Sequence, residues 1–273
     1  MRMSMECPLV TVVVPVYNVR EYVADCIRSV LNQTYPNIEC ICVDDGSTDG
    51  SSDVLDGFKD DSRMVVVRQE NGGVSVARNR ALELARGDYM TFLDAADLFC
   101  ADFIEKAVAD FAADPNLDLW VGQVVKVDEN NVPFDDQPGR PPVCDTENVL
   151  DDFLHFHGRH YLFSICPKVY RAAVIRENGI RFRVGMKNGE DSLFVTKVYS
   201  FTRKGRITNA EVYRRRMRGG SAVGTPWASQ VPDSLEAIVD LIEFARQSSS
   251  PDSVYRAIAQ RALARLGAMP VAA

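Results

Sequence analysis

Histidine and tryptophan are scarce in this sequence of 273 residues, with three and two copies, and no two cysteines have the CxxC spacing. The seven cysteines are an odd number, and Cys40 and Cys42 alternate within an apolar run, as small strand residues do. Zinc sites and disulfide frameworks need regularly spaced cysteines or histidines. We therefore expect a reduced, cytoplasmic protein without a zinc site.

Long apolar runs are also absent. The longest strongly apolar stretch covers residues 9–17, well short of the ~20 residues that cross a bilayer. Pro15 interrupts this stretch and no small-residue cleavage site follows it, so it does not fit a signal peptide. We expect it to be a strand.

Basic residues are outnumbered by acidic ones, with 31 Lys and Arg against 38 Asp and Glu, which gives a formal net charge of −7. Such a surface repels phosphate backbones, so we expect no nucleic-acid partner, although a local basic pocket is compatible with it. The composition, 46% hydrophobic and 25% charged, is that of an ordinary globular protein with room for a sizeable core.

Strand-like and helix-like segments alternate through the first half of the chain. Apolar and β-branched runs predict strands at residues 10–16, 38–43, 64–67, 89–93 and 117–121. Apolar spacings of three and four, with turn and capping residues, predict helices at 20–33, about 50–58, 74–85 and 102–113. This order predicts an α/β sandwich with a mostly parallel central sheet, in which ligands bind beyond the carboxyl ends of the strands.

The second half is less regular. Residues 128–147 are rich in Asp, Asn, Pro and Gly and predict a long surface excursion. Residues 180–184 fit a strand, and a helix is expected from Glu190 or Asp191 to residue 201. From residue 222 onward we expect a C-terminal helical extension, with helices at 232–247 and 252–267.

Six motifs, taken in order, resemble the inverting glycosyltransferases of family 2. They are PVYN at 15–18, VDDGSTD at 43–49, NGGxSxARN at 71–79, FLD at 92–94, GED at 189–191 and YRRR at 213–216, which leads to Ser221. The resemblance runs from about residue 8 to residue 221. It implies a GT-A fold in residues 1–221, with a nucleotide-sugar half at about 8–121 and an acceptor half at about 122–221.

The resemblance implies that the turn containing Pro15, Tyr17 and Asn18 flanks the base of a nucleotide-sugar donor together with Asp44. A carboxylate can accept a hydrogen bond from the ring N–H of uracil, so we expect a UDP-sugar. Asp45 either joins this nucleotide site or only orients the turn. Taken alone, each aspartate of the 44–49 loop could equally be a helix cap.

The diphosphate end of the donor is assigned to basic residues. Arg78 would reach the ribose or the diphosphate, or else pair with a nearby aspartate. One or more arginines of residues 214–218, with Arg214 and Arg216 as the named candidates, would close over the diphosphate together with Ser221, because arginine suits bidentate phosphate contacts. The sequence does not show which of these arginines makes the contact. The competing interpretations of this basic run are a solvated strand and a contact with anionic lipid.

Asp191 is the candidate general base. Inverting transfer needs a carboxylate opposite the leaving group, to take the proton of the attacking acceptor hydroxyl. Glu190 would tune that base or bind the acceptor. Both residues also fit an acidic pair favoured by the dipole at a helix N-terminus, and the two interpretations are compatible.

The metal motif departs from the family pattern of Asp-x-Asp. The sequence reads Asp94-Ala95-Ala96-Asp97, with Ala96 where the carboxylate that binds Mn²⁺ or Mg²⁺ is expected. A methyl group cannot bind a hard cation, so we expect the metal site to be weakened or lost, with Asp94 and Asp97 as the remaining candidate ligands. Asp94 is also a candidate nucleotide ligand, which would hold either the ribose or the metal. Ala96 is then an engineered change, a natural departure, or the mark of a catalytically silent protein that binds nucleotide-sugars and acts through a partner.

The acceptor implied by the resemblance is a saccharide or a lipid-linked saccharide, with cell-surface polysaccharide assembly as the default for the family. Residues 253–269 predict a basic amphipathic helix that would suit peripheral contact with the inner face of a membrane. Packing on the domain or on a second subunit explains the same pattern, and we favour it. The sugar, the linkage and the oligomeric state do not follow from the sequence.

Overall fold

The computed structural model describes residues 7–134, 143–149, 152, 164–186, 188–217, 240 and 243. The strands in these residues are β1 (Val10–Val16), β2 (Ile38–Asp44), β3 (Met64–Arg68), β4 (Tyr89–Phe92), β5 (Leu98–Phe99), β6 (Leu119–Val127), β7 (Cys144–Thr146), β8 (Lys168–Arg171) and β9 (Gly205–Arg216). The longer helices are α1 (Arg20–Leu31), α3 (Val74–Leu84), α4 (Phe103–Ala113) and α7 (Glu190–Tyr199), and the shorter ones are α2 (Ser51–Asp56) and α6 (Ala172–Glu177).

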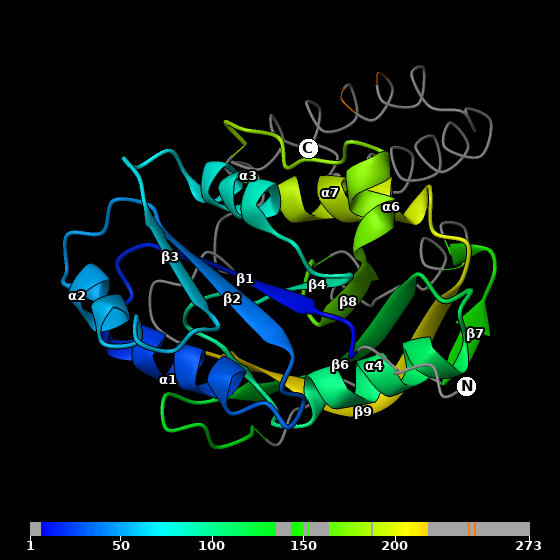
Figure 1. Cartoon of the computed structure of the whole chain (residues 1–273), viewed down its shortest axis with the longest axis horizontal. Helices are drawn as coiled ribbons and strands as arrows, with labels where there is room; N and C mark the ends of the chain where they lie inside the picture. Colours follow the sequence, from blue (N-terminus) through cyan, green and yellow to red (C-terminus); the bar gives the residue numbers. More distant parts are fainter. Residues whose placement is uncertain are drawn as a thin grey trace, which may run out of the picture.

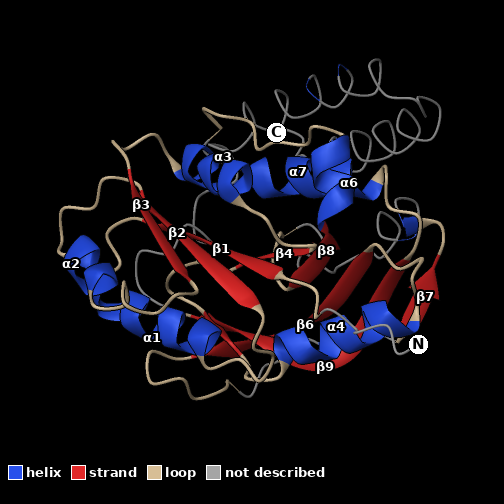
Figure 2. Cartoon of the chain, in the orientation of Figure 1, coloured by secondary structure: helices blue, strands red, loops and turns tan. Residues whose placement is uncertain are grey.

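The described strands form one sheet in the order β3-β2-β1-β4-β8-β6-β9-β5, with β7 paired to β9. Helices α1, α2 and α4 lie on one side of this sheet, and α3, α6 and α7 lie on the other (Figures 1 and 2). Within the described part of the chain, no helix is long and apolar enough to span a bilayer.

The predicted α/β sandwich is confirmed, and its parallel sheet holds for the first four strands. β3, β2, β1 and β4 are parallel neighbours, and β6 is parallel to β9. β8 is antiparallel to both β4 and β6, and β5 and β7 are antiparallel to β9, so the sheet as a whole is mixed and the prediction of a mostly parallel sheet needs this correction. β8 lies between β4 and β6 and runs opposite to both, and an antiparallel neighbour can be reached without a crossover helix.

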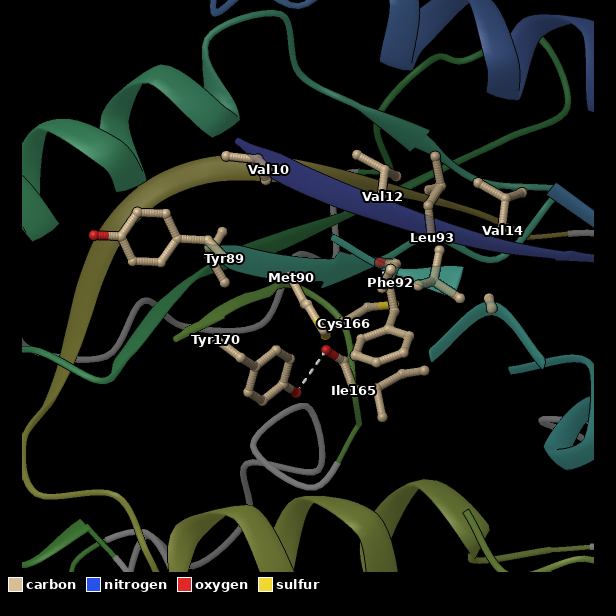
Figure 3. Close-up of a cluster of buried hydrophobic side chains, with 14 of the residues drawn as sticks. Val10, Val12, Val14, Tyr89, Met90, Phe92, Leu93, Ile165, Cys166 and Tyr170 are labelled. Carbon is tan, nitrogen blue, oxygen red and sulfur yellow. Dashed lines mark hydrogen bonds between the residues drawn. The ribbon is translucent and has the colours of Figure 1, made fainter. Parts of the chain in front are cut away.

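The parallel strands β1, β2 and β4 are buried on both faces, as continuous apolar runs predict, whereas β3 is partly exposed. Every residue of β2 is buried, and in β1 only Pro15 is partly exposed. On the side of the sheet that faces α7, Phe92 lies near Ile165, Cys166 and Tyr170, and the Tyr170 hydroxyl donates to the Ile165 carbonyl at 2.9 Å (Figure 3). This core supports the residues that follow β4.

Phe92 also makes edge-to-face contacts with Phe182 and Phe194, at 5.6 Å between ring centroids in both cases. Phe182 and Phe194 stack on each other with centroids 4.0 Å apart. Such contacts add to the free energy gained from burying the rings. They hold α7, which begins at Glu190, against the sheet beneath β4.

Helices at 20–33, 74–85, 102–113 and 190–201 are confirmed as α1, α3, α4 and α7, each within a few residues. The predicted strand at 180–184 is wrong. The Phe182 N–H donates to Asn79 Oδ1 at 2.9 Å, and the Phe182 carbonyl accepts from Asn79 Nδ2 at 2.8 Å. The backbone groups of Phe182 therefore bond to a side-chain amide of α3 and not to the backbone of a neighbouring strand. The sequence did not predict β5, β7, β8 or α6, and it suggested a strand in the β9 region only as a competing interpretation of the basic run. The predicted C-terminal extension lies outside the described residues, apart from helical positions 240 and 243.

Two opposite edges of the sheet matter for function. The carboxyl ends of β1, β2, β4, β6 and β9 lie at one edge, with the start of β8, and we call it the carboxyl edge. The opposite edge holds the first residues of the same strands, and we call it the amino edge.

Candidate functional site

Two loops at the carboxyl edge bind each other where β1 and β2 end. The Asn18 N–H donates to Ser47 Oγ at 3.0 Å, and Asn18 Oδ1 accepts from the Thr48 N–H at 2.8 Å. Asn18 adopts a φ of +48°, a conformation that asparagine tolerates better than most residues. Pro15 lies within β1, two residues before Tyr17, whose ring is half exposed. This arrangement presents an aromatic ring and a polar turn to solvent.

Asp44 and Asp45 are both buried but use their oxygens differently. Asp45 accepts from the Gly72 and Gly73 N–H groups at 2.9 and 2.8 Å, and from the Gln69 amide at 2.7 Å, which engages both of its oxygens. Asp44 accepts only from the Ser47 N–H, at 3.0 Å, through one oxygen. Asp45 therefore orients the glycine loop, one of the two predicted alternatives, while Asp44 keeps an oxygen available to a ligand.

Arg78 lies in α3 and has only 3% of its surface exposed. Its guanidinium pairs with Asp191 at 2.7 Å, with Asp94 at 3.0 Å and with Glu190 at 3.1 Å. The guanidinium also lies over the Phe182 ring, 5.2 Å from its centroid. The structure thus shows the ion-pair alternative for Arg78. This one buried cation contacts three carboxylates, one in the turn after β4 and two at the start of α7.

Glu190 and Asp191 begin α7, which follows Gly189 with a φ of +85°. Burial and the neighbouring charge of Asp191 raise the pKa of Glu190 to about 7. Burial also raises the pKa of Asp191, against the lowering effect of Arg78 and with a further rise from Asp94. Because the two carboxyls interact strongly, they titrate as a pair, and one proton is held between them near neutral pH.

Asp97 is the second aspartate of the altered metal motif at residues 94–97, and both of its oxygens accept hydrogen bonds. The Tyr213 hydroxyl donates to Asp97 Oδ2 at 2.7 Å, and the Arg216 N–H donates to Asp97 Oδ1 at 2.8 Å. Burial and the charge of Asp94 raise the pKa of Asp97 to about 6. The Asp94 N–H reaches the same Tyr213 hydroxyl at 3.4 Å, so β9 clamps the 94–97 turn.

These residues do not fit a protein-held divalent cation. Ala96 offers a methyl group, Asp97 has no unengaged oxygen, and one oxygen of Asp94 is held by Arg78. No group of three or more metal-ligating side chains occurs among the described residues. Mn²⁺ and Mg²⁺ need several oxygen ligands, so we derive no catalytic step through an ion held by this motif.

The arginines of β9 alternate between the two faces of the sheet. Arg214 lies near the Cys100 thiol and lowers its pKa, against the raising effect of burial. The Arg216 guanidinium lies over the Tyr22 ring of α1, 5.1 Å from its centroid. The side chains of Arg214 and Arg216 therefore share the face of the sheet that α1 and α4 cover. Arg215 lies on the face of Tyr213, whose hydroxyl contacts the 94–97 turn. The side chains of the predicted diphosphate ligands Arg214 and Arg216 thus lie on the face of the sheet opposite to Tyr213 and Arg215, and Ser221 lies outside the described residues.

The pattern that defines the group described as glycosyl transferase family 2 matches residues 11–172. The chain belongs to this family. The predicted resemblance is confirmed, because the matched range includes the 15–18, 43–49, 71–79 and 92–94 motifs.

Individual relatives support the same assignment. Glycosyltransferase GlyA of Streptococcus pneumoniae is 32% identical over 85% of this chain, and the poly(ribitol-phosphate) beta-glucosyltransferase of Bacillus spizizenii is 30% identical over 71%. This family 2 chain covers only 34% and 30% of the lengths of those two proteins. The crystal structure of S. aureus TarS 1–349 in complex with UDP-GlcNAc superposes on 86% of this chain and 66% of its own length, with a TM-score of 0.72 and 23% identity. That similarity confirms the GT-A fold.

Two members of the site were not predicted for this family 2 chain. The Tyr213 hydroxyl and the Phe182 ring beneath Arg78 both depend on contacts between distant segments. Arg215 belongs to the 214–218 run that was predicted to close over the diphosphate, without a choice among its arginines. Tyr213 lies 116 residues from Asp97. Period-two alternation along residues 213–216 was the one available signal, since it separates Arg215 from Arg214 and Arg216.

Proposed function

We propose that this chain transfers a sugar from a UDP-linked donor to an acceptor hydroxyl with inversion, with Asp191 as the general base. The observation that carries the proposal is the meeting of Asp94, Glu190 and Asp191 around Arg78, at the same edge of the sheet as the Tyr17 and Asp44 loops. A polar nucleotide end and an acidic reaction end are thereby joined in one site.

Asp44 and Tyr17 are the proposed contacts for the uracil base. Asp44 keeps an oxygen that can accept from the uracil ring N–H, and the half-exposed Tyr17 ring offers a surface for stacking. The relation to TarS, which has been crystallised with UDP and with UDP-GlcNAc, supports a uridine donor.

Asp191 would remove the proton of the acceptor hydroxyl as its oxygen attacks the anomeric carbon. The bond from that carbon to the diphosphate oxygen breaks, and its electron pair leaves with the diphosphate. A base with a raised pKa holds a proton more readily near neutral pH, which suits this task. Glu190 would tune Asp191 through the proton that the pair shares, and Arg78 would position both carboxyls.

The proposed acceptor is a hydroxyl of a saccharide or lipid-linked saccharide used in cell-surface polymer assembly. Related proteins carry names from teichuronic acid biosynthesis and poly(ribitol-phosphate) glucosylation, which supports this class. Action in the cytoplasm, at the inner face of the membrane, is part of the same proposal.

The test is release of UDP from UDP-GlcNAc and UDP-glucose, with water as the acceptor, measured for the unaltered chain, Asp191→Asn and Asp60→Asn. Asp60 is exposed and distant in the fold, so its variant is the control. We expect Asp191→Asn to lose at least about 100-fold in rate, as removal of a general base does, while UDP binding persists. Full activity in Asp191→Asn would refute the base assignment. UDP binding without release by the unaltered chain would favour the catalytically silent alternative.

A further inference from the structure

We infer that a fixed side-chain cation, the guanidinium of Arg215, neutralises the leaving diphosphate in place of a divalent metal ion. This inference rests on the proposed function and deepens it. It starts from the carboxylates of the 94–97 turn, in which Arg78 holds one oxygen of Asp94, and Tyr213 and the Arg216 N–H hold both oxygens of Asp97. A site that lacks ion ligands still has to stabilise the charge that the diphosphate gains when the glycosidic bond breaks.

Among the described residues, Arg78 and Arg216 are committed elsewhere. Both terminal nitrogens of Arg78 bind carboxylates, and the side chain is buried. Arg216 lies on the opposite face, over the Tyr22 ring and 3.8 Å from Asp25. Neither guanidinium can turn to a diphosphate without breaking these contacts.

Arg215 differs from both. Its guanidinium makes no hydrogen bond or ion pair in the part of the chain that the structure describes, and the residue is partly exposed. It lies on the face of Tyr213, and the charges of Asp97 and Asp94 act on it. An arginine with unfilled donors beside the reacting end of the site is suited to a bidentate contact with phosphate oxygens.

A neighbouring strand adds positive charge on this face. Arg215 is in register with Lys126 of the parallel strand β6, so the two side chains lie on the same face of the sheet. The diphosphate would therefore meet Arg215 with a second cationic side chain on the same face.

The chemical step is balanced without a metal. The acceptor oxygen bonds to the anomeric carbon, the bond from that carbon to the β-phosphate oxygen breaks, and the electron pair stays on that oxygen. The acceptor proton goes to Asp191. Arg215 forms no covalent bond and changes no oxidation state, since it only donates hydrogen bonds to phosphate oxygens.

The experiment is calorimetric binding of UDP and of uridine, each in EDTA and in Mn²⁺, to the unaltered chain, Arg215→Gln and Arg214→Gln. Arg214 is the matched control because it carries the same charge one residue away on the other face. We expect UDP to bind the unaltered chain with similar affinity in both buffers. Arg215→Gln should weaken UDP binding about tenfold or more, the worth of one charge-assisted contact, and leave uridine binding unchanged. Arg214→Gln should change both by less than about threefold.

Tightening of UDP binding by Mn²⁺ in the unaltered chain by about tenfold or more would overturn the inference alone. Equal losses in the two arginine variants would also overturn it, because the effect would then be general charge. Equal weakening of uridine and UDP by Arg215→Gln would place the residue away from the diphosphate and overturn it too. Absence of UDP binding to the unaltered chain in both buffers would overturn the proposed function together with the inference. Thermal melting of both variants confirms that they fold.

Discussion

Buried carboxylates lie at both edges of the sheet, and their environments differ. At the amino edge, burial raises the pKa of Glu39. Hydrogen bonds from the Thr11 hydroxyl, the Arg86 backbone and the Arg86 side chain lower it by more than burial raises it, so the net shift is downward. Asp118 behaves in the same way, because Arg203 and Arg171 outweigh the effect of burial. At the carboxyl edge, burial wins, and the pKa values of Asp97 and Glu190 are raised.

The difference shows which carboxylates serve the fold and which serve the site. Glu39 is surrounded by donors, so its charge stabilises the folded chain. Glu190, Asp191 and Asp94 share a single arginine and repel one another. Groups held with raised pKa values and too few partners are typical of reactive sites, where stability is given up for chemistry.

The largest expected effect comes from removing the shared cation. Arg78→Met leaves three carboxylates around a buried apolar side chain, and we expect a loss of about 3–5 kcal/mol in the free energy of unfolding at pH 8. The loss should shrink at pH 5, because the carboxyls can then take up protons. Urea unfolding at the two pH values measures this. Arg80→Met is the control, since Arg80 pairs only with Glu83 on an exposed helix face and should cost less than about 1 kcal/mol. An equal loss at both pH values would contradict the charge argument.

Replacing one glutamate at each edge sharpens the comparison. A lowered pKa, as in Glu39, contributes stability above the unfolded value that is lost as pH falls. A raised pKa, as in Glu190, means that the folded state binds the extra proton between about 4.5 and 7, so stability falls as pH rises through that range. We expect Glu39→Gln to destabilise the chain at pH 8 by about 1–3 kcal/mol. Glu190→Gln should remove about 1–3 kcal/mol of the decline in stability between pH 5 and pH 8. Unfolding curves across this range test both, and parallel pH profiles for the two variants would refute the contrast.

A smaller effect is expected on the acid limb of the pH–activity profile when Glu190 is replaced. The unaltered chain should release UDP from UDP-GlcNAc with a limb near pH 7, as the Glu190 and Asp191 pair loses its shared proton. In Glu190→Gln the like charge is gone, so the limb should move about half a unit to one unit lower. The pH dependence of kcat/KM measures the shift. A limb that stays in place would separate Glu190 from the base.

The smallest expected effect is a partial return of metal dependence. In Ala96→Asp the new carboxylate can join only the unengaged oxygen of Asp94, because Asp97 stays held by Tyr213 and Arg216. We expect Mn²⁺ to tighten UDP binding to this variant by about two- to fivefold, since two carboxylates are few ligands for such an ion. Calorimetry with and without Mn²⁺ measures it. Tightening of 100-fold would show that Asp97 can be released from β9.

Strands β1 to β4, and their common edge, could be predicted because each is a mainly apolar run followed by a polar segment. The loops at 15–18, 44–49 and 94–97 thus follow β1, β2 and β4 as expected. The cluster around Arg78 could be foreseen only as one of two alternatives, since Arg78 and Asp191 are 113 residues apart. Period-two alternation alone places Arg215 on the same face of a strand as Tyr213. Four charged or aromatic residues in a row carry no apolar pattern, however, so the sequence does not show which face meets the site.

The position of β9 has a consequence for how the chain is made. β9 comes last among the described strands, yet it lies between β6 and β5, and its Tyr213 and Arg216 hold the 94–97 turn. β8 covers the free side of β4 in the same late fashion. A nascent chain that has emerged only as far as residue 127 therefore carries strands with exposed hydrogen-bonding groups and an acidic turn without its clamp. Such edges invite pairing with other chains, so a ribosome that stalls before residue 216 would release an aggregation-prone fragment.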